Sequence, residues 1–143
     1  VGAASVGVDE AEVRRAESFG NALGMGFQIQ DDLLDYQAYG ESGKPAGIDV
    51  REQKMTLPVI HAVQQADPDQ KRWMINTVKN HHTDRKRVHE LIALVKALGG
   101  LSYATTQMNA YKDQALELLA GYPDSVYKNA LITMVRFVVE REK

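Results

Sequence analysis

The chain has 143 residues, of which 44% are hydrophobic and 25% charged, and its formal net charge is −2. These values are ordinary for a soluble globular domain, and the charge does not favour non-specific binding to nucleic acid or to anionic membranes. The absence of cysteine excludes disulfides and thiolate chemistry. No apolar run approaches the roughly 20 residues that span a bilayer, and no signal peptide is visible, so we expect a cytoplasmic protein without a transmembrane segment.

The first predicted element is a long helix from about Glu10 to about Ala38. Asp9 is typical of a helix N-cap, with Glu12 as its capping-box partner. Three glycines interrupt the helix, namely Gly20, Gly24 and Gly26. Two interpretations stay open for them: close helix–helix packing, or room beside the carboxylates for a ligand chain or for the backbone of a partner.

The second half of this helix carries three aspartates, Asp31, Asp32 and Asp35, in an otherwise apolar run. A helical step of about 100° per residue points all three into one sector. Two like charges about 4 Å apart repel by roughly 4 kcal/mol at an effective dielectric near 20. A divalent cation would remove that cost, and a few carboxylates suit Mg²⁺ that keeps water and substrate phosphate as further ligands. The alternative is a solvated acidic face.

A predicted loop, Tyr39 to Arg51, follows and contains four residues that break regular structure: Gly40, Gly43, Pro45 and Gly47. Lys44 lies in this loop, and Lys54 lies just before the next predicted helix, in which Pro58 suits the first turn. Two ammonium groups beside a magnesium-binding acidic face would form a diphosphate site. They would stabilise the charge that develops on a leaving diphosphate. Elsewhere in a chain, two such lysines would be ordinary surface residues.

The rest of the chain also predicts helices. Asp67-Pro68 is a helix start, and a further helix is predicted around residues 88–95 and another over about 101–120. His81, His82 and His89 lack metal-ligand spacing and are assigned to the surface. The last helix is expected to bury six apolar residues: Val126, Ala130, Leu131, Met134, Val135 and Val138. No segment alternates with period two, so the predicted fold class is all-α.

These residues together resemble a known family. The pattern comprises Gly20-x-x-x-Gly24-x-x-Phe27-Gln28-Ile29-x-Asp31-Asp32-x-x-Asp35-Tyr36, then Gly43-Lys44-x-x-Gly47-x-Asp49, then Lys54-x-Thr56-Leu57-Pro58. It is similar to the C-terminal half of the trans-isoprenyl diphosphate synthases, the polyprenyl synthetase family. The resemblance covers residues 1–143, and the N-terminal half of a family member would lie outside this chain, which begins with Val1.

The resemblance implies roles for individual residues. Asp31, Asp32 and Asp35 match the second aspartate-rich motif, which helps to hold Mg²⁺ on an allylic diphosphate. The remaining matches are catalytic or diphosphate-binding positions: Gln28, Lys44, Lys54 and Thr56, with a looser match of Arg141 and Lys143 to a C-terminal tail that can close over the site. The implied fold is a helical bundle around a deep central cavity, usually in a homodimer.

The implied reaction condenses isopentenyl diphosphate with an allylic diphosphate and lengthens the chain by one isoprene unit. The first aspartate-rich motif and the isopentenyl diphosphate site would lie upstream, so product length is not readable here, and we expect this chain alone to be inactive. Two alternatives stay open. A class I terpene cyclase also uses D-D-x-x-D, and a non-catalytic partner subunit of a heteromeric synthase would share the fold.

Overall fold

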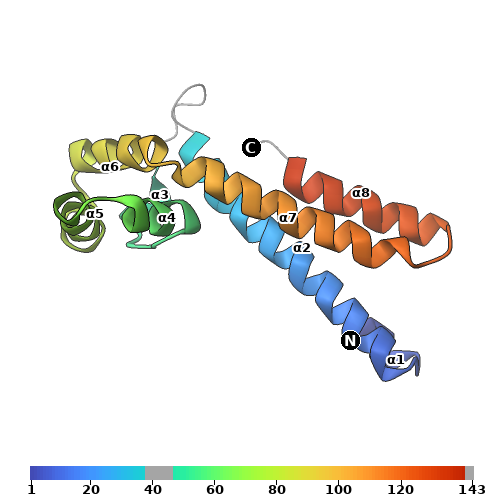
Figure 1. Ribbon diagram of the computed structural model, residues 1–143. Coiled ribbons are helices and arrows are strands. Elements are labelled where there is room, and N and C mark those ends of the chain that lie inside the picture. The colour runs from blue at the N-terminus through green and yellow to red at the C-terminus, as the bar shows by residue number, and fades with distance from the viewer. Residues whose placement is uncertain (38–46, 141–143) are drawn as a thin grey trace. The chain divides into compact units, whose positions relative to one another are not determined.

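The computed structural model describes residues 1–37 and 47–140. Within these residues every regular element is a helix, which confirms the all-α prediction (Figure 1). The helices are α1 Gly2–Ser5, α2 Glu10–Gln37, α3 Ile48–Arg51, α4 Leu57–Gln65, α5 Pro68–Asn80, α6 Arg85–Ala97, α7 Gly100–Ala120 and α8 Val126–Glu140. They form two compact units, one of residues 1–30 and 107–143, the other of residues 31–106.

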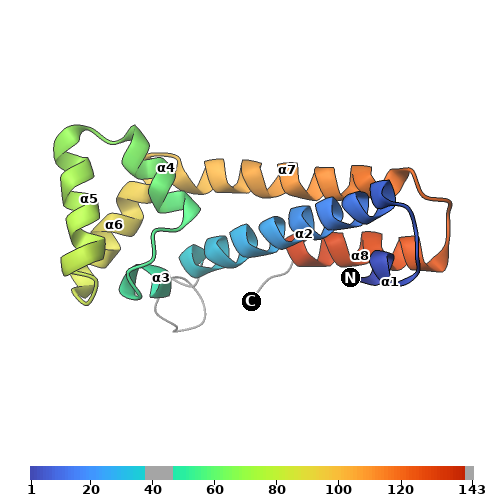
Figure 2. The same cartoon turned by 90° about the horizontal axis from the view of Figure 1, so that it is seen from below.

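The first unit is built from the first part of α2, the last part of α7, and α8. In both views α8 runs back along α7 after a short connection (Figures 1 and 2). Its core contains Ala22, Ala115 and Val135. The predicted N-cap is confirmed, because the Asp9 carboxylate accepts the Glu12 N–H at 2.8 Å. The Glu12 carboxylate, however, accepts the Tyr122 hydroxyl at 2.6 Å, which ties α2 to the segment between α7 and α8.

The three glycines of α2 have different surroundings. A Cβ at Gly26 would lie 3.8 Å from the Tyr111 Cβ and 3.9 Å from a Val139 methyl, so Gly26 lies where α2 packs against α7 and α8. At Gly20 and Gly24 a Cβ would meet nothing within 4 Å in the described structure. The close-packing interpretation therefore describes Gly26, whereas room for a ligand chain beside Gly20 and Gly24 stays a prediction.

The predicted buried face of α8 is partly wrong. Val135 is fully buried as expected, and Val139 is buried beside it, one turn later. Val126, Ala130 and Met134 are exposed in the described structure. Because apolar residues surround much of this helix, its sequence does not single out one face. On α2, Ile29 and Leu33 are buried in the described structure, whereas Phe27 is exposed.

The second unit contains α3 to α6, and α4, α5 and α6 pack against one another (Figure 2). Their shared core includes Val59, Met74, Leu91 and Val95, all completely buried. A local sequence signal starts α5. The Asp67 carboxylate accepts two backbone N–H groups at 2.9 Å, and the Gln70 side chain completes a capping box at the predicted start of α5.

The stretch predicted as a loop up to Arg51 contains a short helix, α3, which corrects that prediction. Gly47 precedes α3 with φ 77°, in the left-handed region where glycine is favoured. The start of α7 is also crowded, because a Cβ at Gly100 would lie 2.4 Å from the Pro58 carbonyl oxygen. These two glycines therefore set how closely α3 and α7 approach the helices beside them in this unit.

Candidate functional site

Only some residues of the site predicted from sequence belong to the part of the chain that the structure describes. Lys44, Arg141 and Lys143 lie outside the described residues, so their predicted contacts with a diphosphate stay predictions. Lys54, Thr56 and the three aspartates all belong to the second unit. Gln28 is exposed on α2 and belongs to the first unit, and its predicted role also stays a prediction.

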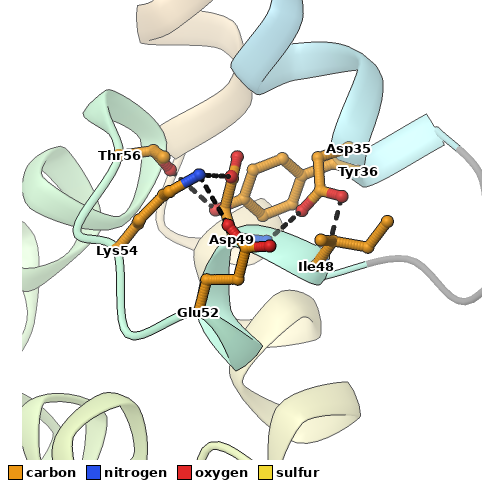
Figure 3. A network of polar contacts seen from close by, with 7 residues as sticks. All are labelled: Asp35, Tyr36, Ile48, Asp49, Glu52, Lys54 and Thr56. Atoms are coloured by element: carbon orange, nitrogen blue, oxygen red, sulfur yellow. Dashed lines mark hydrogen bonds and ion pairs between the residues drawn. The ribbon is translucent and has the colours of Figure 1, made fainter.

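The three aspartates of α2 lie in different environments. Asp31 is exposed and Asp32 is half-buried, whereas Asp35 is only 4% exposed. The two oxygens of Asp35 accept backbone hydrogen bonds, one from Ile48 at 3.1 Å and one from Asp49 at 3.2 Å. Asp35 therefore points into the protein toward α3, as Figure 3 shows.

Lys54 lies just after α3 and is surrounded by carboxylates (Figure 3). Its ammonium contacts the Glu52 carboxylate at 2.7 Å and the Asp49 carboxylate at 3.4 Å. These partners, Glu52 first, raise the pKa of Lys54, so the group keeps its charge at neutral pH. The side chain is still 57% exposed, which leaves the ammonium accessible to a ligand in solution.

The negative charge of Asp49 is disfavoured by the surroundings of its carboxylate. Burial raises the pKa of its carboxyl, the nearby Asp35 carboxylate raises it further, and the hydrogen bond from Lys54 opposes both effects. Such a balance is common where acidic groups gather, because burial and like charges both disfavour ionisation. A bound cation would favour the charged form of these acids.

Thr56 is buried and lies directly before α4. Its hydroxyl does not cap the helix but lies 3.3 Å from the Tyr36 hydroxyl (Figure 3). Burial raises the pKa of Tyr36 well above its usual range, so the phenol stays neutral. The predicted place of Thr56 near a reacting carbon stays a prediction, while its link to α2 is a contact that the sequence did not indicate.

The fit of a divalent cation differs among the three aspartates. Asp31 and Asp32 reach solvent and can offer oxygens to an ion that keeps part of its water shell. Asp35 has little accessible surface, and backbone amides already bond both of its oxygens. In the described part of the chain, no three Asp, Glu or His side chains are grouped so that they could hold a metal ion. The three-aspartate metal site therefore stays a prediction.

Sequence reasoning missed the partners of Lys54 and Thr56. Glu52 and Asp49 lie two and five residues before Lys54, a spacing that has no special meaning in a loop. The Tyr36–Thr56 pair joins residues 20 positions apart. An acidic residue next to a predicted phosphate-binding lysine is the one signal that could have suggested the ion pairs.

Comparison with known proteins identifies the family. The model of the family described as "Polyprenyl synthetase" matches residues 1–95. The chain belongs to the polyprenyl synthetase family. It is 33% identical over 138 residues to the octaprenyl diphosphate synthase of Escherichia coli (strain K12), a match that covers 96% of this chain and 42% of the relative.

Solved structures of this family have the same fold. A geranylgeranyl pyrophosphate synthase from Bacteroides thetaiotaomicron is similar with a TM-score of 0.87 and 38% identity, over 97% of this chain and 46% of that one. A polyprenyl synthase from Caulobacter crescentus CB15, complexed with calcium and isoprenyl diphosphate, gives a TM-score of 0.82 and 31% identity, over 99% and 44% of the two chains.

The chain thus spans less than half the length of the family members that it matches. In residues 1–37 and 47–140 no helix combines the length and apolarity needed to cross a bilayer.

Proposed function

We propose that the protein is a prenyl diphosphate synthase that condenses isopentenyl diphosphate with an allylic diphosphate, and that this chain supplies part of its allylic diphosphate site. The observation that carries the proposal is the accessible Lys54 ammonium in the unit that also holds Asp31 and Asp32, in a chain of the polyprenyl synthetase family. The names of similar proteins, octaprenyl and geranylgeranyl synthases, support the substrate class.

Lys54 would bind a phosphate oxygen of the leaving diphosphate. Its ammonium is charged at neutral pH and has access to solvent, so a diphosphate can replace or join its two carboxylate partners. As the C–O bond of the allylic substrate breaks, negative charge grows on the diphosphate. A cation beside it therefore stabilises the transition state more than the ground state.

Asp31 and Asp32 are the residues that would hold Mg²⁺ between the protein and the diphosphate. The ion would neutralise phosphate oxygens of the leaving group. The complex of calcium and isoprenyl diphosphate with the Caulobacter crescentus enzyme supports a divalent cation for this chain as well. Homodimerisation, the cytoplasmic location and the roles of Gln28 and Thr56 belong to the same proposal.

The test is an elongation assay on the complete protein, with labelled isopentenyl diphosphate, farnesyl diphosphate and Mg²⁺. Lys54→Ala should lower kcat/KM by about 100-fold, the scale for losing one electrostatic donor to a transition state. Lys71→Ala is the matched control, because Lys71 is an exposed lysine of α5 in the same unit. It should leave the rate unchanged.

Two results would contradict the proposal. A parental protein that elongates no allylic diphosphate of any length would favour a non-catalytic partner subunit. Equal rates for Lys54→Ala and Lys71→Ala would remove Lys54 from the site, even in an active enzyme.

A further inference from the structure

Asp35 holds three successive residues at the start of α3. Its carboxylate accepts the N–H groups of Ile48 and Asp49, at 3.1 and 3.2 Å, and its backbone carbonyl accepts the Gly47 N–H at 3.3 Å. The first N–H groups of a helix lack partners within the helix, and a carboxylate is a favourable acceptor for them. Asp35 thus acts as the N-terminal cap of α3 from 13 residues earlier in the chain.

This geometry does not suit a metal ligand. Both carboxylate oxygens of Asp35 accept hydrogen bonds from backbone amides, and the residue is 4% exposed. Mg²⁺ keeps several waters and needs octahedral space around it. An ion on Asp35 would have to displace the cap of α3, whereas Asp31, one turn earlier on α2, is exposed.

The cap controls where Lys54 lies. Asp49 is held by Asp35 through its N–H, and its own carbonyl accepts the Lys54 N–H at 2.8 Å. The Asp49 carboxylate then contacts the Lys54 ammonium at 3.4 Å. Beyond Lys54, the Tyr36–Thr56 contact fixes the start of α4. Two consecutive residues of α2 therefore anchor the backbone on both sides of Lys54 (Figure 3).

We propose that Asp35 is a positioning residue, which caps α3 and thereby places the Lys54 ammonium for a diphosphate, and is not a ligand of the metal ion. The diphosphate part of this inference rests on the proposed function, whereas the cap does not. The aspartates of the motif then divide by role: Asp31 and Asp32 would bind the ion, and Asp35 holds the lysine segment in place.

The first experiment measures the cap directly in the complete protein. Hydrogen exchange of the Ile48 and Asp49 amides should be slow before Mg²⁺ and inorganic pyrophosphate are added, and should stay slow afterwards. In Asp35→Asn one acceptor oxygen becomes an NH₂ group, so exchange at these amides should quicken by about tenfold, the scale for one lost hydrogen bond. Asp31→Asn is the matched control and should leave both amides protected.

The second experiment separates positioning from metal binding, by calorimetry with inorganic pyrophosphate and Mg²⁺. Asp35→Asn should weaken pyrophosphate binding about tenfold, with the Mg²⁺ concentration for half-saturation unchanged, whereas Asp31→Asn and Asp32→Asn should raise that concentration. Because Asp35 acts through Lys54, the double variant Asp35→Asn/Lys54→Ala should bind no more weakly than Lys54→Ala alone.

Three outcomes would overturn the inference. Fast exchange of the Ile48 and Asp49 amides in the parental protein would remove the cap. A rise in the required Mg²⁺ in Asp35→Asn equal to that in Asp31→Asn would make Asp35 a ligand. Additive losses in the double variant would separate Asp35 from Lys54. A parental protein that binds pyrophosphate but elongates nothing would refute the proposed reaction alone, because these readouts need no turnover.

Discussion

Gly47→Ala should destabilise the second unit by more than an ordinary surface substitution. The residue has φ 77°, and the left-handed conformation costs a residue with a Cβ about 1–2 kcal/mol. The new methyl would also lie 2.9 Å from Ile92 Cδ1 and 3.0 Å from Val88 Cγ1 in the core. Overpacking of this kind costs about 1–3 kcal/mol. The sum is about 2–5 kcal/mol, a large part of the roughly 5–15 kcal/mol that stabilises a domain.

A second variant, Gly99→Ala, separates the backbone cost of Gly47→Ala from its packing cost. Gly99 has the same φ of 77° in the same unit, but among the described residues a Cβ there would meet only the Ser102 hydroxyl within 4 Å, at an ordinary 3.5 Å. Gly99→Ala should therefore lower the free energy of unfolding only by the backbone cost, about 1–2 kcal/mol. The measurement is urea unfolding followed by fluorescence of Trp73, the single tryptophan, which packs against the core of this unit. Equal losses in the two variants would refute the packing argument, and losses below about 0.5 kcal/mol in both would refute the backbone argument.

The other predictions concern caps and titration. Asp67→Ala should cost about 1 kcal/mol in the same urea experiment, because it removes the capping box of α5; Asp69→Ala, which keeps the cap, should cost less. Burial raises the pKa of Asp49 above 3.8, so its stabilising contribution is present when it is protonated and is lost as pH rises through the raised pKa. Asp49→Asn should therefore gain stability relative to the parent as pH rises from below 3.8 through the raised pKa of Asp49, and a constant difference would contradict this. Burial also raises the pKa of Tyr36, so an absorbance titration should lose its last phenol transition in Tyr36→Phe; loss of an earlier transition would contradict the burial.

Helix starts that depend on neighbouring residues could be predicted from the sequence. The capping box of α5 needs only Asp67 and Gln70, three positions apart, and both the box and the helix are present. Pro58 in the first turn of α4 is a similar case. Such signals act within one helical turn, so they can be recognised before the rest of the fold is known.

The sequence did not predict what depends on distant contacts. The spacing of Asp35 from Asp31 puts both on one sector of α2, but it does not show that the Asp35 carboxylate bonds α3, 13 and 14 residues later. The short helix α3 was not predicted, because the glycines that precede it in the sequence indicate a loop. On α8, burial of Val135 and Val139 depends on what packs against that helix, which no periodicity within it could decide.

The division of the chain into units has a consequence for synthesis on the ribosome. The second unit is one continuous segment, residues 31–106, whereas the first combines residues 1–30 with residues 107–143. The hydrogen bond from Tyr122 to Glu12 joins positions 110 apart, so it cannot form until residue 122 has been made. Contacts between distant positions form slowly, and surfaces that wait for them are exposed to aggregation. The amino-terminal part of α2 therefore leaves the ribosome well before the segments of this unit that it packs against have been made.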